Sequence, residues 1–162
     1  MLIRLESNVT PLMTAVPCRV KGVFVALNPA GSVPVVILSD ETSRLLPIFI
    51  GISEAVSIQN ARSGEMLPRP FTHDLFIDAF QKFGISVASL QIDAINDGVY
   101  YAQIVLLKDH QEIRVDCRPS DGIALALRAA APISVEQEVL DSAGQKDEDL
   151  PPLIDLETFY KQ

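Results

Sequence analysis

The sequence predicts an α+β fold, in which two three-strand meanders form a mostly antiparallel sheet and about three helices pack on it. Three observations predict this fold. The 162 residues are 48% hydrophobic but only 6% aromatic, so the core is aliphatic and rich in strands. Short apolar runs occur in two groups of three with brief turns between them, and brief turns join antiparallel neighbours. Helical patterns follow each group.

The first meander is expected between residues 19 and 50. Clusters of turn-forming residues at 28–32 and 39–44 divide this stretch. The expected strands are 19–27, 33–38 and 45–50. Pro34 and Pro47 cannot donate a hydrogen bond to a neighbouring strand, which places them at strand starts or on an edge.

Two helices are expected between the meanders. Ser53 is the expected N-cap of the first, with Glu54 in its first turn, and this helix runs to about Ser63. Thr72 is the expected N-cap of the second. The second helix has one apolar stripe, formed by Phe76, Ala79, Phe80 and Phe83, and ends at Gly84.

The second meander is expected to contain strands 85–94, 99–107 and 112–117, with a tight hairpin turn at Asp97-Gly98. Alternation in the last strand predicts that Ile113, Val115 and Cys117 face inward. Cys117 is therefore interpreted as a core residue rather than a nucleophile. A third helix, 119–130, and a short strand, 132–136, are expected to follow.

The chain is expected to divide into an N-terminal arm (1–18), one domain (19–140) and an acidic, partly mobile C-terminal tail (141–162) with one docked turn near 156–160. The formal net charge is −8, and most of it lies after residue 135. The longest apolar run, 45–52, is too short to span a membrane, and the first residues do not resemble a signal peptide. We therefore expect a cytoplasmic protein with no membrane partner.

Two polar groups are not required by the strand and helix patterns. Arg69, His73 and Asp74 form one, and Arg118, Ser120 and Asp121 form the other; both precede or begin an expected helix. A helix N-terminus beside an arginine favours phosphate, and nearby carboxylates can hold a divalent metal ion. His73 could act as general acid or base, with a metal ion or water positioned by acidic residues, namely Glu54, Glu65, Asp74 or Asp121.

A structural alternative exists for most of these residues. Thr72, Asp74, Ser120 and Asp121 can all be helix caps, and Arg118 can cover a sheet edge. His73 is the residue that capping explains least. Glycine-rich phosphate loops and the common hydrolase and zinc motifs do not occur in the sequence, so an ordinary cofactor enzyme is not indicated.

Three segments carry a resemblance to a known family. They are 46–55 (LPIFIGISEA), 69–75 (RPFTHDL) and 118–128 (RPSDGIALALR). In this order they resemble the bifunctional nuclease domain family, over roughly residues 19–140. One departure is Gly122, where the family more usually has a small side chain. The resemblance implies a compact α+β domain, often oligomeric, in a family named for DNase and RNase activity.

Two functions follow from these observations. The first is a nuclease that hydrolyses DNA and RNA, and its site residues are inferred from the chemistry at the motif positions. The catalytic residues would be His73, Asp74 and Asp121; the phosphate-binding residues Arg69, Arg118 and Ser120; and the ligands of Mg²⁺ or Mn²⁺ Glu54, Asp74 and Asp121. The alternative is a non-catalytic homo-oligomeric scaffold or regulatory module that binds a protein or small ligand. The acidic charge opposes nucleic-acid binding, and apolar residues in excess of one small core favour subunit contacts.

Overall fold

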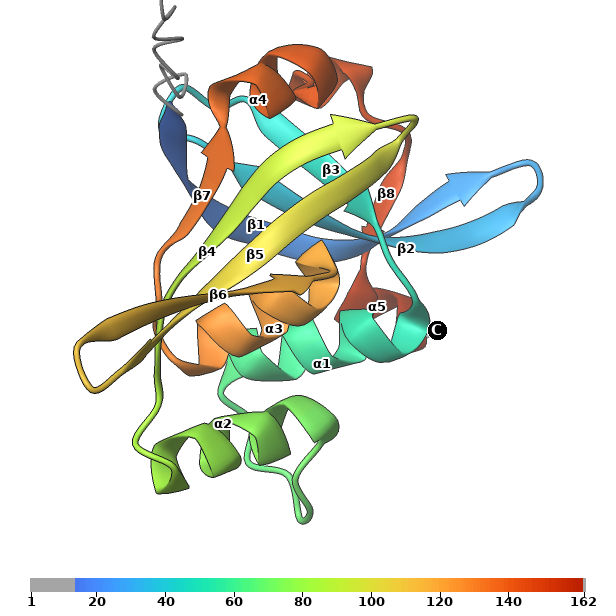
Figure 1. Cartoon of the computed structure of the whole chain (residues 1–162). Helices are drawn as coiled ribbons and strands as arrows, with labels where there is room; N and C mark the ends of the chain where they lie inside the picture. Colours follow the sequence, from blue (N-terminus) through green and yellow to red (C-terminus); the bar gives the residue numbers. More distant parts are fainter. Residues whose placement is uncertain (1–13, 162) are drawn as a thin grey trace, which may run out of the picture.

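The computed structural model describes residues 14–161, which build one mostly antiparallel sheet of eight strands with helices packed on it (Figure 1). The strand order is β3-β2-β1-β7-β4-β5-β6, and β8 pairs separately with β1. The strands are β1 (Ala15–Asn28), β2 (Gly31–Ser39), β3 (Leu45–Phe49), β4 (Ser86–Asn96), β5 (Val99–Lys108), β6 (Gln111–Cys117), β7 (Ile133–Glu136) and β8 (Leu153–Asp155). The helices are α1 (Ile52–Ser63), α2 (Thr72–Lys82), α3 (Pro119–Arg128), α4 (Gln137–Ala143) and α5 (Leu156–Tyr160), with a 3₁₀ turn at Asp147–Asp149. The α+β class and the mostly antiparallel sheet are confirmed.

The sheet consists of two meanders joined by a short central strand. β1, β2 and β3 pair in sequence, as do β4, β5 and β6. β7 lies between the groups, antiparallel to β1 and parallel to β4. The connection from β6 through α3 to β7 therefore carries the chain back to the middle of the sheet and makes one continuous sheet from the two meanders.

Helices α1 and α3 cover one face of the sheet, and α2 lies beyond them (Figure 1). Fully buried aliphatic side chains fill the space between these helices and the strands. They include Ile58 of α1, Ile123 of α3, and Leu90, Ile92 and Val135 of the central strands. This packing fixes the positions of α1 and α3, whose first turns carry the candidate site residues.

The expected helix caps are displaced by one or two residues. The N-cap of α1 is Gly51 rather than Ser53, and that of α2 is Phe71 rather than Thr72. Asp74 accepts a hydrogen bond from the backbone N–H of Phe71 at 2.8 Å, so the capping interpretation holds for Asp74. For Ser120 and Asp121 it is wrong, because the N-cap of α3 is Arg118 and no side chain caps it.

The C-terminal segment contributes to the sheet and the core, and the docked turn expected near 156–160 is helix α5. β8 pairs with β1, and Asp155 caps α5 by accepting from the backbone N–H groups of Glu157 and Thr158. Leu156 is only 2% exposed. α4 and α5 also raise the number of helices above the expected three. These short elements show little periodicity in the sequence, and their contacts with distant strands stabilise them.

The expected N-terminal arm covers residues 1–18, and its first 13 residues lie outside the described part of the chain. Ala15–Cys18 do not form an arm. They extend β1 and pair with β7 in antiparallel register, from Ala15 opposite Glu136 to Cys18 opposite Ile133.

The last strand of the second meander is an edge strand. Ile113 and Val115 were expected to face inward, but they are 43% and 42% exposed, and Cys117 alone of the three is half-buried. Alternation does place the three side chains on one face of β6. That face is covered poorly, because β6 is the outermost strand of its meander.

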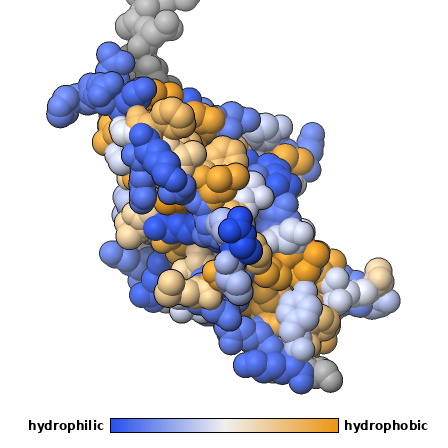
Figure 2. All heavy atoms as spheres, turned by 90° about the horizontal axis from the view of Figure 1, so that it is seen from below, coloured by the Kyte–Doolittle hydropathy of each residue, from blue (hydrophilic) through white to orange (hydrophobic). Residues whose placement is uncertain are grey.

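Helix α2 uses only part of its apolar stripe for contacts within the chain. Every residue of α2 is exposed or half-buried, and the neighbouring Phe83 is 69% exposed. Figure 2, which views the molecule from the side where α2 lies, shows hydrophobic residues gathered in patches among hydrophilic ones.

Among the described residues, no helix has the length and apolar character needed to cross a membrane.

Candidate active site

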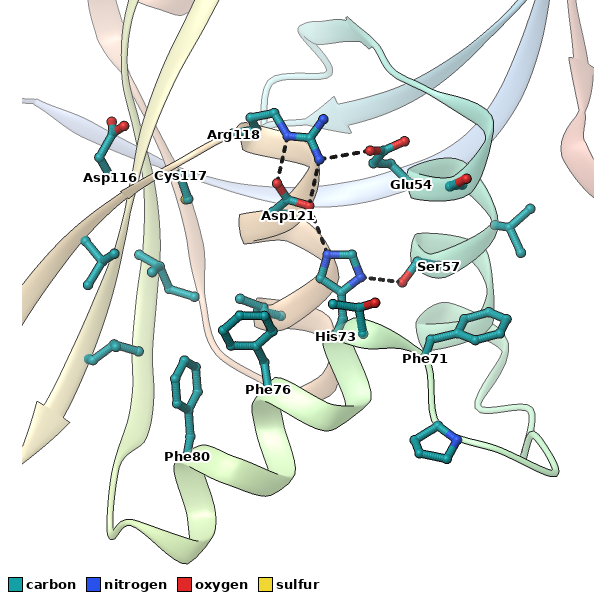
Figure 3. Close-up of a pocket in the computed structure, with 18 of the residues that line it drawn as sticks. Glu54, Ser57, Phe71, His73, Phe76, Phe80, Asp116, Cys117, Arg118 and Asp121 are labelled. Atoms are coloured by element: carbon teal, nitrogen blue, oxygen red, sulfur yellow. Dashed lines mark hydrogen bonds and ion pairs between the residues drawn. The ribbon is translucent and has the colours of Figure 1, made fainter.

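A cleft of about 1080 Å³ runs between α2 and the strands β5 and β6, with a polar group of side chains at one end (Figure 3). Its volume is just above the range of roughly 300–1,000 Å³ found for small-molecule sites. The apolar lining comes from α1, α2, α3, β5 and β6 and includes Phe76, Phe80, Ile104, Leu106, Val115 and Leu125. The polar end includes Glu54, Ser57, His73, Arg118 and Asp121.

His73 lies at the centre of the polar group and connects two helices. Its Nε2 atom is 3.0 Å from Oδ1 of Asp121, at the start of α3, and its Nδ1 atom is 2.8 Å from Oγ of Ser57, in α1. An ionised carboxylate only accepts hydrogen bonds, so a neutral His73 carries its proton on Nε2. Nδ1 is then an acceptor, and the Ser57 hydroxyl donates to it. The three side chains form a hydrogen-bonded relay from Asp121 through His73 to Ser57.

Arg118 links the two carboxylates of the group. Its Nε donates to Oδ2 of Asp121 at 2.8 Å, and its Nη2 donates to Oε1 of Glu54 at 2.9 Å. Burial would raise the pKa of Asp121, but hydrogen bonds from Arg118 and His73 outweigh burial and lower that pKa below its usual value. Asp121 is therefore ionised at neutral pH. The Arg118 side chain remains 66% exposed, so its guanidinium also faces solvent at the cleft.

Asp74 is adjacent to His73 in sequence but belongs to a different network. Its Oδ1 accepts from Nε of Arg128 at 2.6 Å, and this hydrogen bond lowers the pKa of Asp74. Arg128 also donates to the backbone carbonyls of Ser57 and Ala124. Arg128 is only 8% exposed, and these three hydrogen bonds join α1, α2 and α3 beneath the polar group. The position of Asp74 indicates a structural role.

The other sequence-derived candidates also lie away from the polar end. Arg69 and Ser120 are not among the residues that line the cleft, and Ser120 is buried at the start of α3. Glu65 lines a smaller hollow that it shares with Asp74 and Arg128. Of the eight candidates, the structure brings four together: Glu54, His73, Arg118 and Asp121.

The three carboxylates expected to bind a metal ion are not assembled into one site. Glu54 and Asp121 lie on either side of Arg118, whereas Asp74 faces Arg128. Within residues 14–161, no group of three or more His, Cys, Asp or Glu side chains has metal-binding geometry. In this arrangement the Arg118 guanidinium occupies the position between Glu54 and Asp121, so the donor set does not fit a divalent cation without movement of Arg118.

Sequence reasoning missed Ser57 and Arg128. Ser57 follows Glu54 by three residues, which places both on one face of α1. Arg128 belongs to the third motif segment, but nothing in its spacing indicates a buried partner.

Cys117 lines the cleft as well, and burial raises the pKa of its thiol to about 11, so the thiol stays protonated at neutral pH.

The fold and the polar group define a class of α+β domain in which three helical first turns converge at one end of a cleft. Residues 36–148 match the family model described as the bifunctional nuclease domain. This match covers more than half of the chain, and the chain therefore belongs to the bifunctional nuclease domain family, as its three sequence segments indicated.

Relatives of the chain fall into two groups. An uncharacterised protein of Mycobacterium tuberculosis strain H37Rv is 41% identical over 112 residues, which are 68% of this chain and 66% of that protein. Bifunctional nuclease 2 of Oryza sativa subsp. japonica is 31% identical over 110 residues, and bifunctional nuclease 2 of Arabidopsis thaliana is 29% identical over 112. The matched region is about two thirds of this chain but only 34% of each plant protein.

Proposed function

We propose that the chain is a nuclease that hydrolyses phosphodiester bonds of DNA and RNA. The observation that carries the proposal is the relay from Asp121 through His73 to Ser57, with Arg118 exposed beside it at a large cleft. Residues far apart in the sequence meet there, from the N-terminal halves of three helices and the residue before α3. The names of the plant relatives, bifunctional nucleases, support the same function.

In the proposed reaction, His73 removes a proton through Ser57. A water molecule that attacks phosphorus gives its proton to the Ser57 hydroxyl oxygen, while the Ser57 proton passes to Nδ1 of His73. Asp121 holds the imidazole and stabilises its positive charge. The leaving oxygen lies on the opposite side of phosphorus and takes a proton from solvent, and His73 returns its proton to solvent after the reaction. Arg118 donates to a phosphate oxygen from the solvent-facing side of its guanidinium.

The charge of the polar group affects how a phosphate would bind. With His73 neutral, the carboxylates of Glu54 and Asp121 and the guanidinium of Arg118 sum to −1. A negative site opposes phosphate binding. Glu54 and Asp121 would hold Mg²⁺ or Mn²⁺ only if Arg118 moved from between them, and the ion would then supply positive charge for the phosphate. We therefore propose that cleavage requires one of these ions.

The test uses the full chain with labelled single- and double-stranded DNA and RNA, with and without Mg²⁺ or Mn²⁺. We expect cleavage by the unmodified chain, and at least a hundredfold slower cleavage by His73→Ala and Asp121→Ala. Asp78→Ala is the matched control, because Asp78 is an exposed carboxylate of α2 that pairs with Lys82. Equal cleavage by all four preparations would identify the activity as a contaminant and refute the proposal.

A second candidate function is the homo-oligomeric scaffold or regulatory module. The observation that favours it is the exposed apolar surface of β6 and α2, where Ile113, Val115 and Phe83 all face solvent. Monomeric proteins rarely leave such patches uncovered. Oligomerisation and nuclease activity are compatible, so absence of cleavage together with a stable oligomer is the result that would favour the scaffold over the nuclease.

A further inference from the structure

The two edges of the sheet are built differently. At one edge, β3 contains Pro47, is buried over four of its five residues, and is bridged by Gln145. At the other edge, β6 has seven residues without proline, of which six are exposed. An exposed edge strand offers backbone N–H and C=O groups to another strand. The features that protect β3 from pairing do not occur in β6.

One side of β6 is apolar and continues into the cleft. Ile113 and Val115 project from this side, and Val115 lines the cleft together with Phe76 of α2. Phe83, just after α2, is the most exposed aromatic side chain of the described residues. A strand placed along β6 would extend the sheet and bring further side chains over this surface.

The charged side of β6 indicates which strand would fit. Glu112 and Arg114 project from the same side, since their side chains contact each other at 2.6 Å. They flank Ile113 symmetrically. When two copies of β6 lie antiparallel with Ile113 opposite Ile113, Glu112 faces Arg114 of the second copy, and Arg114 faces Glu112 of the second copy. A two-fold symmetric interface requires this kind of self-complementarity.

The register in which Arg114 replaces Ile113 at the centre is disfavoured by charge. If Arg114 lay opposite Arg114 of the second copy, then Glu112 would lie opposite Asp116 of the second copy. Like charges directly opposite each other destabilise a strand pair. We propose that the chain forms a two-fold symmetric dimer through antiparallel pairing of β6 with β6 of a second copy, centred on Ile113. This proposal does not depend on nuclease activity.

Light scattering after size exclusion tests the dimer with the full chain. Twice the chain mass of 17.7 kDa is 35.4 kDa, which is the expected mass. Arg114→Glu and Glu112→Arg should each raise the dimer dissociation constant at least tenfold, because each variant places like charges opposite one another. The double variant should restore the dimer, since the pairs are then reversed but again complementary. Glu41→Arg, a charge reversal in the exposed turn before β3, is the control.

A cysteine variant tests the register independently. In the proposed pairing, Ile113→Cys places two thiols directly opposite each other, so mild oxidation should produce a disulfide-linked dimer on a non-reducing gel. Val99→Cys, at the exposed start of β5, is the control and should not cross-link. Circular dichroism of each variant checks that the fold is retained. A mass of 17.7 kDa for the unmodified chain, or a dimer that neither charge reversal weakens, would overturn the proposal.

Discussion

Replacement of Arg128 by methionine tests whether the buried network beneath the polar group holds the three helices together. Methionine keeps an apolar stem of similar length but removes the hydrogen bond of 2.6 Å to Asp74 and those to the carbonyls of Ser57 and Ala124. A hydrogen bond between charged groups contributes roughly 1.5–3 kcal/mol. Asp74 is partly exposed and can recover solvation, so we expect a loss of about 3 kcal/mol for all three bonds together.

The free energy of unfolding by urea measures this loss directly. For a domain of this size, about 3 kcal/mol corresponds to a fall in melting temperature of roughly 6–12 °C. Lys82→Met is the matched control, because Lys82 pairs with Asp78 on the surface of α2 and its side chain is 71% exposed. We expect the control to change stability by less than about 1 kcal/mol. Equal losses for Arg128→Met and Lys82→Met would refute the structural role of Arg128.

Three further predictions concern other parts of the molecule. Leu156→Ala should cost about 2–4 kcal/mol in urea unfolding, because Leu156 is buried under β1, whereas Tyr160→Ala in the same helix should cost less than half as much. Asp74→Asn should weaken the fall in the free energy of unfolding at acid pH, as urea unfolding between pH 2 and 6 would reveal. The pKa of Asp74 is lowered in the folded state, so its contribution to stability is complete above the unfolded pKa of about 3.9 and is lost as pH falls through the folded pKa. Cys18 and Cys117, each with a pKa raised to about 11 by burial, should react with iodoacetamide at pH 8 at least tenfold more slowly than in the urea-unfolded chain; equal rates by mass spectrometry would contradict this.

The two meanders could be predicted because their information is local. Each turn, such as Asp97-Gly98, lies between the strands that it joins. The position of β7 could not be predicted in the same way. Its four residues pair with Ala15–Cys18 at one side and with Leu90–Ile92 at the other, which are distant in the sequence. The short elements α4 and β8 were missed for the same reason, since long-range contacts stabilise them.

The structure brings three of the predicted residues together because each begins a helix. Glu54, His73 and Asp121 each lie in the first turn of a helix, and the starts of these three helices converge. Two predicted residues that lie apart from this group, Asp74 and Ser120, are the immediate sequence neighbours of His73 and Asp121. One residue along an α-helix turns the side-chain direction by about 100°. Asp74 therefore points to Arg128 while His73 points into the cleft, and Ser120 is buried while Asp121 is not.

Gly122, the one departure from the family pattern, is explained by the packing of α3 on the sheet. A Cβ atom at this position would overlap Cδ1 of Leu90 and lie 3.1 Å from Sγ of Cys117. Glycine in a helix costs up to about 1 kcal/mol relative to alanine. Here it allows α3 to approach β4 closely, while Leu90, which is fully buried, fills the space that a methyl group would take. Gly122 directly follows Asp121, whose carboxylate lies 3.0 Å from Nε2 of His73, so this close packing of α3 on β4 lies next to the site.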